Sequence, residues 1–231
     1  MSKILFISGI DTDAGKTFAT GWLAREMRRG GVKTVTQKPI QTGCGCTGGA
    51  ANSLKPEVFA LPSGCDIIVH REIMGCGLLP EDREGLTAPE IFPYPASPHL
   101  ASKLAGREID FAKIDAASRA LAERYDVVLV EGAGGLMTPL TENYSTIDFI
   151  RERGYPVVFV TSAKLGSINH TLLALDALRA RGMSLQSLLF NSFPETDPII
   201  AEETQRFLRR VIERDWKGTE FKIVPNILTS E

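Results

Sequence analysis

The chain has 231 residues, of which 43% are hydrophobic and 23% are charged, and its formal net charge is −2. This length fits one α/β domain of roughly 200–250 residues, and the charge excludes the strongly basic footprint of a dedicated nucleic-acid binder. No apolar run approaches the ~20 residues of a membrane-spanning helix, and the apolar run 4–8 meets Asp11 too soon for a signal peptide. We therefore expect a cytoplasmic globular domain of enzyme size.

Short apolar runs alternate with amphipathic segments along most of the chain. The runs predict buried strands, and apolar residues at helical spacing, such as Leu172, Leu175 and Leu178, predict helices. The expected order is strand 4–8, helix 17–29, strand 32–37, helix 111–125, strand 126–130, strand 157–161, helix 168–181, strand 185–190, helix 199–213 and strand 221–224. Buried strands separated by helices indicate an α/β fold, a parallel sheet with helices on both faces.

Residues 39–98 depart from this alternation. They hold most of the prolines, all four cysteines and the glycine-rich stretch 43–49. We expect loops and short helices here, as an irregular segment within a single domain spanning 1–231. Cys44, Cys46, Cys65 and Cys76 do not have the spacing of a zinc ribbon, so we expect free thiols in a reducing cytosol ahead of a metal or redox site.

The strongest motif is GIDTDAGKT at residues 9–17, which follows an apolar strand and opens a helix. Backbone N–H groups of such a loop wrap phosphate oxygens, Lys16 can reach the terminal phosphates, and the Thr17 hydroxyl can ligate Mg²⁺. The usual spacing has a glycine where Ile10 stands. A plain strand-to-helix turn would not call for Gly-Lys-Thr, so the motif predicts a P-loop NTPase-like nucleotide site.

Two further polar positions follow predicted strands. Glu131 ends the apolar run 127–130 and precedes Gly-Ala-Gly-Gly, at the edge where ligands collect in open α/β sheets. Lys38, before Pro39, leaves the sheet at the same edge and could neutralise a transferring phosphoryl group, with Thr42 adding a hydroxyl. Alone, Glu131 is as well explained as a solvated acid at a strand end, and Lys38 is better explained as an exposed surface lysine. Beside a phosphate loop, both favour a magnesium–nucleotide site.

Together these motifs resemble the dethiobiotin synthetases, P-loop enzymes that use ATP to close the ureido ring in biotin synthesis. The resemblance extends over nearly the whole chain. The matching residues are Asp11-Thr12, Gly15-Lys16-Thr17, Lys38-Pro39, Ser97-Pro98-His99, Val130-Glu131-Gly132-Ala133-Gly134-Gly135, Lys164-Leu165-Gly166 and Ile168-Asn169-His170. This set in this order is far more specific than a phosphate loop alone.

The resemblance implies ATP and Mg²⁺ as cofactors and diaminopelargonate and CO₂ as substrates. It also implies a homodimer with the substrate site at its interface, and neither nucleic acid nor membrane as a partner. Lys38 and Lys16 would be catalytic, and Thr17, Asp66 and Glu131 would hold the metal. The nucleotide would contact Thr12, Asp13, Ala14, Gly15, Lys16, Thr17, Phe18, Asp66, Glu131, Gly132, Ala133, Gly134, Asn191, Ser192, Pro225, Asn226 and Ile227. The substrate would contact Thr12, Lys38, Thr42, Leu165, Gly166, Ser167 and Asn169.

The chain departs from the family pattern at Ile10, Asp13 and Thr42, where threonine, glutamate and serine are usual. Two alternatives remain. A related P-loop amidoligase would share the loop, but Lys38-Pro39 and Asn169-His170 argue against it. A partition-type nucleotide switch usually carries an additional lysine near the start of the loop, where this chain has none. The three histidines, His70, His99 and His170, are expected to be structural.

Overall fold

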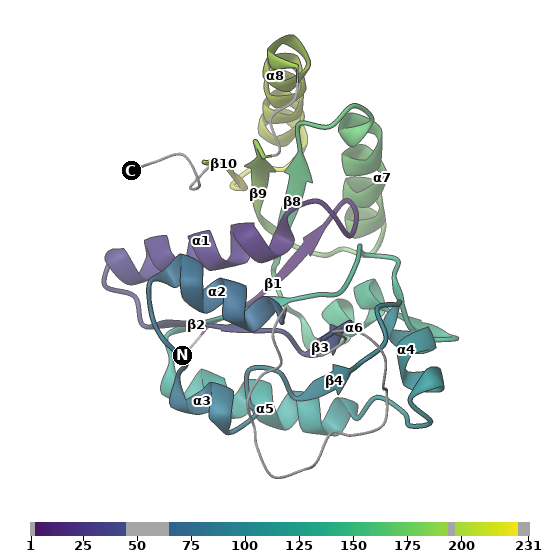
Figure 1. Ribbon diagram of the computed structural model, residues 1–231. Helices are drawn as coiled ribbons and strands as arrows, with labels where there is room; N and C mark the ends of the chain where they lie inside the picture. The colour runs from purple at the N-terminus through teal and green to yellow at the C-terminus, as the bar shows by residue number, and fades with distance from the viewer. Residues whose placement is uncertain (1–2, 45–64, 194–196, 226–231) are drawn as a thin grey trace.

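A six-stranded parallel sheet forms the centre of the fold (Figure 1). The computed structural model describes residues 3–44, 65–193 and 197–225. The strands lie in the spatial order β10-β9-β8-β1-β5-β2. Their bounds are β1 (Lys3–Gly9), β2 (Thr34–Gln37), β5 (Val127–Glu131), β8 (Val157–Ser162), β9 (Leu185–Asn191) and β10 (Glu220–Val224). The predicted α/β class is confirmed, and every predicted strand is present within two residues of its expected bounds.

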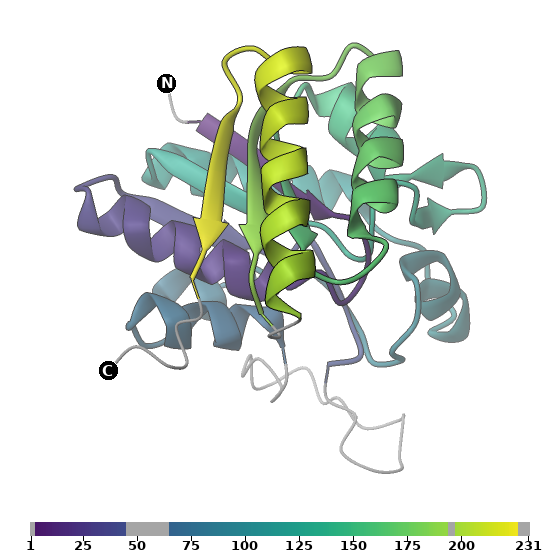
Figure 2. The same ribbon diagram turned by 90° about the horizontal axis from the view of Figure 1, so that it is seen from above.

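Helices cover both faces of the sheet because its strands are apolar on both sides. Along β1, Leu5 and Ile7 face one layer, whereas Phe6 faces the other. The first layer contains α1 (Lys16–Arg29) and α2 (Asp66–Met74). The second contains α5 (Phe111–Arg124), α6 (Thr146–Arg153), α7 (Ser167–Ala180) and α8 (Pro198–Asp215); Figure 2 shows α7 and α8 side by side over β8–β10. Each large apolar side chain buried here stabilises the fold by about 1.5–3 kcal/mol.

Helix α2 packs directly on α1, and a glycine permits the close approach. A Cβ added at Gly21 would lie 3.0 Å from Cβ of Ile73 on α2. At its start, α2 is tied to the end of β3 (Ile40–Thr42), since Gln41 Oε1 accepts a hydrogen bond of 3.0 Å from the Asp66 backbone. These contacts hold the first residue of α2 beside the sheet edge.

The expectation of free thiols is wrong for two of the four cysteines. Cys44, just after β3, and Cys65, just before α2, form a disulfide with their Cα atoms 5.2 Å apart. The packing of β3 against the start of α2 brings the two residues within disulfide reach, which spacing in the sequence does not reveal. Cys76 is a free thiol, and Cys46 lies outside the described residues.

Smaller elements lie outside the main sheet. Strand β3 pairs in parallel with β4 (Glu90–Phe92), and β6 (Pro139–Thr141) forms a hairpin with β7 (Tyr144–Ser145). Two short helices, α3 (Pro80–Arg83) and α4 (Pro98–Leu104), complete this region. None of the helices in residues 3–44, 65–193 and 197–225 combines the length and hydropathy needed to cross a membrane.

The order of the strands indicates that a ligand would bind at the carboxyl end of β1. From this central strand the chain builds β5 and β2 on one side and β8, β9 and β10 on the other. Open parallel sheets bind ligands where the strand order reverses, outside the carboxyl ends of the strands. The loop after β1, the end of β5 and the residue after β2 all meet there.

Candidate active site

The loop after β1 leads into α1 through a glycine that no other residue can replace without strain. Gly15, the N-cap of α1, has φ of 81°, and a Cβ there would lie 2.1 Å from Nδ2 of Asn191. That Nδ2 donates hydrogen bonds to the carbonyl oxygens of Ala14, at 3.1 Å, and Phe193, at 2.9 Å. Asn191, at the end of β9, thus connects the loop after β1 to the segment that follows β9.

Lys16 is buried beneath the same loop. Its side chain is folded back, and Nζ donates hydrogen bonds to the carbonyl oxygens of Asp11, at 2.7 Å, and Thr12, at 3.1 Å. Burial away from water, together with the positive charge of Lys38, lowers the pKa of Lys16 to about 8. A phosphate group would offset both effects, so the loop is electrostatically suited to an anion.

A charged cluster lies at the ends of β2 and β5 and at the start of α2. Lys38 Nζ lies 2.6 Å from Asp66 Oδ2 and 2.8 Å from Glu131 Oε1, and it also donates to the Gly132 carbonyl oxygen at 3.1 Å. Thr17, in the first turn of α1, donates to the same Glu131 Oε1 at 3.0 Å. Thr17 lies on α1, Asp66 on α2, Glu131 on β5 and Lys38 just after β2, and the fold brings all four together.

The charges of this cluster hold one another in the ionised state. Burial opposes the ionisation of Glu131, but the Lys38 ammonium and a hydrogen bond from His70 outweigh it and keep the pKa of this carboxyl well below its usual value. Burial also opposes a charge on Lys38, yet Glu131 and Asp66 raise its pKa above the usual value. Lys38 therefore remains a cation, suited to contacting an anionic group rather than to taking up a proton.

The residues predicted for the substrate carboxylate lie around the start of α7. Gly166 is the N-cap of that helix, Leu165 is 80% exposed, and Asn169 is exposed on the first turn. Ser167 is buried, and its Oγ donates to the Lys164 carbonyl oxygen. A cavity of 290 Å³ connects this helix start to the phosphate loop, with Leu165 and Ser167 on one side and Ile10, Asp11, Asp13 and Ala14 on the other.

The remaining predicted residues have less defined surroundings. Thr42, at the end of β3, is half-buried, as are Phe18 and Ser192, whereas Pro225 is exposed. Asn226 and Ile227 lie outside the described residues, so the predicted base-enclosing loop is represented only by Pro225.

His70, which is expected from the sequence to be structural, also contacts this charged cluster. His70 is fully buried on α2, and its Nε2 lies 2.7 Å from Glu131 Oε2. The sequence does indicate that His70 lies near Asp66, since it follows Asp66 by four residues and so shares its helix face. The contact with Glu131, 61 residues away in sequence, was not predictable from that spacing.

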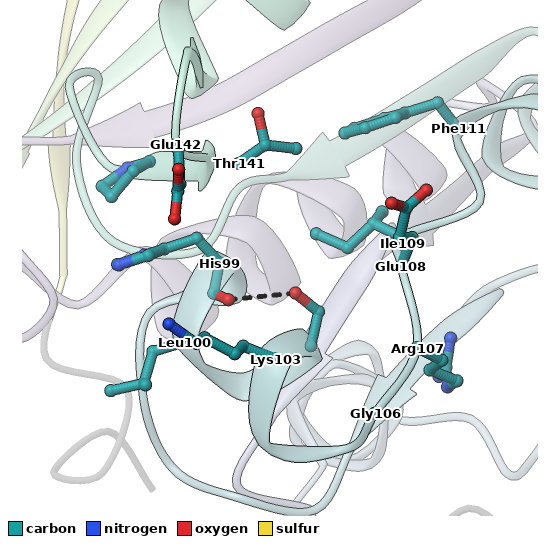
Figure 3. A pocket seen from close by; sticks show the side chains of 12 residues that line it. His99, Leu100, Lys103, Gly106, Arg107, Glu108, Ile109, Phe111, Thr141 and Glu142 are labelled. Carbon is teal, nitrogen blue, oxygen red and sulfur yellow. Dashed lines mark hydrogen bonds between the residues drawn. The ribbon is translucent and has the colours of Figure 1, made fainter.

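A larger cavity, of 960 Å³, lies elsewhere, between α4 and the β6–β7 hairpin (Figure 3). Its lining includes His99, Arg107 and Glu142 but none of the predicted site residues. His99 Nδ1 lies 3.0 Å from Ser97 Oγ, and its carbonyl oxygen accepts from Ser102. Both contacts are local, to the N-cap residue of α4 and to its own helix.

A phosphate loop after the central strand, with a carboxylate at the end of the neighbouring strand, defines the class as a P-loop nucleotide-binding α/β protein. A family model described as AAA domain matches residues 3–219. Among solved structures, pNOB8 ParA bound to nonspecific DNA has a TM-score of 0.52 at 12% identity, covering 94% of this chain and 77% of that one. This likeness concerns the fold alone.

Comparison with curated proteins identifies the family. The chain is 46% identical to the ATP-dependent dethiobiotin synthetase BioD 2 of Pasteurella multocida, over 97% of this chain and 98% of that protein. It is 47% identical to BioD 2 of Haemophilus influenzae (88% and 98%) and 42% identical to BioD of Chlorobaculum tepidum (92% and 82%). The chain belongs to the dethiobiotin synthetase family and is an ATP-dependent ligase, which confirms the resemblance found in the sequence.

Proposed function

We propose that the cluster around Lys38 carries out the family's reaction in biotin biosynthesis. Diaminopelargonate is carboxylated with CO₂, the carbamate is phosphorylated by ATP, and ring closure gives dethiobiotin, ADP and phosphate. The observation that carries this assignment is the meeting of Lys16, Lys38, Thr17, Asp66 and Glu131 at one sheet edge. This arrangement supplies the positive charge and oxygen ligands that phosphoryl transfer requires.

The chemistry needs positioning and charge neutralisation rather than a protein nucleophile. One amine of the substrate adds to CO₂ to form a carbamate, whose oxygen attacks the γ-phosphorus of ATP with ADP leaving. The second amine then attacks the carbamoyl carbon of the mixed anhydride, expelling phosphate and closing the ring. Lys38 is the cation that contacts the carbamate and the transferring phosphoryl group, while Lys16 and the backbone of the loop hold the β- and γ-phosphates.

The oxygen atoms of Thr17, Asp66 and Glu131 fit Mg²⁺. Mg²⁺ prefers hard oxygen ligands, and nucleotide sites supply one or two carboxylates alongside phosphate oxygens and water. The Lys38 ammonium between Asp66 and Glu131 supports this fit, since these carboxylates already share a cation. When bound, the metal would neutralise charge on the β- and γ-phosphates. Asn191, Ser192 and Pro225-Asn226-Ile227 would surround the base.

A homodimer would complete the substrate site. Exposed apolar side chains near the phosphate loop and the start of α7 support this proposal, because Met137 (60% exposed) and Leu173 (62%) line one cavity with the loop, and Leu165 (80%) precedes α7. The start of α7 would receive the substrate carboxylate from the partner's site, consistent with the preference of helix N-termini for anions. Because the reaction consumes ATP, we also place the enzyme in the cytoplasm.

Phosphate release with Mg²⁺-ATP and bicarbonate, measured with and without diaminopelargonate, tests the function. We expect release that depends on the diamine, and a product with the mass of dethiobiotin. Lys38→Ala should lose about 10²–10³-fold in turnover at saturating substrates. Lys33→Ala is the matched control, because Lys33 is an exposed lysine just before β2, whereas Lys38 lies just after it. Full turnover by Lys38→Ala, or phosphate release indifferent to the diamine, would refute the assignment.

The dimer is tested separately by light scattering coupled to size exclusion. We expect twice the monomer mass without nucleotide and a shift toward monomer for Leu173→Asp. Ile199→Asp is the matched control, because Ile199 on α8 is also a strongly exposed apolar residue at 79%. A monomeric wild-type protein would contradict the proposed interface.

A further inference from the structure

Both carboxylate oxygens of Glu131 are occupied, but by different groups. Oε1 receives Lys38 and Thr17, the residues of the proposed magnesium–nucleotide site. Oε2 instead faces away from them toward His70, whose Nε2 lies at 2.7 Å. His70 is 0% exposed, so no water competes for this contact. The rotation of the Glu131 carboxylate therefore depends on a buried imidazole.

The donor inventory of the surrounding groups determines which ring nitrogen of His70 carries the hydrogen. The Nδ1 atom lies 3.1 Å from Thr36 Oγ1, which also receives Arg71 Nη1 at 2.8 Å. The Glu131 carboxylate only accepts, so Nε2 must carry the hydrogen that it receives; in the neutral ring Nδ1 then accepts the Thr36 hydroxyl hydrogen, while the Thr36 oxygen accepts from Arg71. Nδ1 is then the acceptor, and Nε2 presents its hydrogen to Glu131.

Arg71 is itself locked in place. Its Nε and Nη2 donate to Asp82 Oδ2, at 2.8 Å, and Oδ1, at 2.6 Å. Asp82 also accepts from Thr87 Oγ1 and from the Leu79 backbone, both at 2.7 Å. Bidentate arginine–carboxylate pairs have a fixed geometry. The donors therefore run in one direction, from the Arg71–Asp82 pair through Thr36 and His70 to Glu131.

We propose that His70 is a positioning residue for Glu131, held in its donor tautomer by Thr36 and the Arg71–Asp82 pair, and that it sets the affinity of the site for the magnesium–nucleotide complex. This inference rests on the proposed function, in which Glu131 contacts the metal. Residues that orient metal ligands typically change affinity or activity by 10- to 100-fold when mutated. A purely structural buried histidine would instead affect nucleotide binding equally with and without magnesium.

Three variants and one control distinguish these roles. His70→Leu keeps the volume but removes the donor, whereas His70→Gln can return an N–H near the position of Nε2. Thr36→Val removes the hydroxyl that orients the ring and accepts from Arg71, and it keeps the test decisive if His70→Leu does not fold. His99→Leu is the matched control, at a histidine lining the separate cavity. Thermal melts establish that each protein is folded.

The measurement is ADP binding by calorimetry, in Mg²⁺ and in EDTA, followed by the KM for Mg²⁺-ATP. We expect His70→Leu to weaken ADP binding about 10- to 100-fold in Mg²⁺ but less than ~3-fold in EDTA. Thr36→Val should weaken ADP binding in Mg²⁺ by a smaller factor than His70→Leu. His70→Gln should recover most of the affinity that His70→Leu loses, and His99→Leu should bind ADP as the wild type does. The KM for the diamine should not change.

Equal losses in Mg²⁺ and EDTA, an unaffected His70→Leu, or no advantage of glutamine over leucine would overturn the positioning role. If His70→Leu does not fold, wild-type affinity in Thr36→Val overturns it. Failure of the proposed function has a different signature. In that case the wild-type protein itself would show no gain in ADP affinity from Mg²⁺, or no phosphate release dependent on the diamine.

Discussion

Replacing Lys38 with methionine tests whether the buried charges of the site depend on one another. Methionine keeps most of the length of the lysine stem but removes the ammonium that lies 2.8 Å from Glu131 Oε1 and 2.6 Å from Asp66 Oδ2. Glu131 is completely buried. Its carboxylate therefore loses its ammonium partner without gaining water.

The expected loss of stability is large. Removing one partner of a buried ion pair costs about 3–5 kcal/mol, equivalent to a fall in Tm of roughly 6–20 °C for a chain of this length. Glu131→Gln should cost less, about 1–3 kcal/mol, because Lys38 keeps Asp66, whose side chain is 24% exposed. The double variant leaves no unpaired buried charge between the two sites. The stability lost by the double variant should be smaller than the sum of the two single-variant losses by about 1–3 kcal/mol.

Urea unfolding of the four proteins, without nucleotide or Mg²⁺ at pH 7, measures this coupling. Fluorescence of Trp22 and Trp216 and far-UV circular dichroism provide two independent signals. Lys33→Met, at an exposed lysine just before β2 whose ammonium lies over the Tyr125 ring, should change the free energy of unfolding by no more than ~1 kcal/mol. If the effects of Lys38→Met and Glu131→Gln add to within ~0.5 kcal/mol, the reasoning from buried charge is refuted.

The pH dependence of the same variants gives an independent check. In the wild type, the lowered pKa of Glu131 contributes stability that is present above its ordinary value of 4.5 and is lost as pH falls. In Lys38→Met, the opposing ammonium is gone and the His70 hydrogen bond remains against burial, so the pKa of Glu131 rises from its wild-type value. The carboxyl then takes up a proton on folding, so the stability difference between wild type and Lys38→Met should shrink as the pH falls from 7 to 5. A deficit that stays constant over this range would contradict the assignment.

Three further predictions concern the loop and the cysteines. The pKa of Lys16 is lowered to about 8, and bound phosphate should raise it, so ADP binding should take up more protons at pH 8.5 than at pH 7. Calorimetry in buffers of different ionisation enthalpy measures the proton uptake at each pH. Equal uptake at the two pH values would contradict the prediction. Gly15→Ala should weaken ADP binding at least ~10-fold, because the alanine Cβ would clash with Asn191 and the positive φ at this position costs alanine roughly 1–2 kcal/mol. Unchanged ADP affinity would show that the loop adapts. Reduction of the Cys44–Cys65 disulfide, which spans 21 residues, should lower the free energy of unfolding by about 3 kcal/mol, and an unchanged urea midpoint would refute this.

The regular part of the fold could be predicted because its signals are local. An apolar run or a helical stripe reports burial over a few residues, and this located the strands of the sheet and helices α1, α5, α7 and α8. The sequence did not locate α6, the β3–β4 pair or the β6–β7 hairpin. The short strands offer too few residues for a period to emerge, and their positions depend on what they pack against.

The candidate site divides in the same way. Gly15, Lys16 and Thr17 could be predicted because the loop and the helix start that bind phosphate are contiguous in the chain. Asp66 was found only through family resemblance. The structure brings it within 2.6 Å of Lys38 by packing α2 on α1 through Gly21.

The sequence by itself determined the fold class, the phosphate loop and the family, because apolar periodicity and contiguous motifs are properties of neighbouring residues. Only the tertiary structure decided the disulfide between Cys44 and Cys65 and the hydrogen bonds that join Thr36, His70 and Glu131. These contacts connect residues that are far apart in the chain. Their distances and donor directions arise only when helices and strands pack, and no local pattern records them.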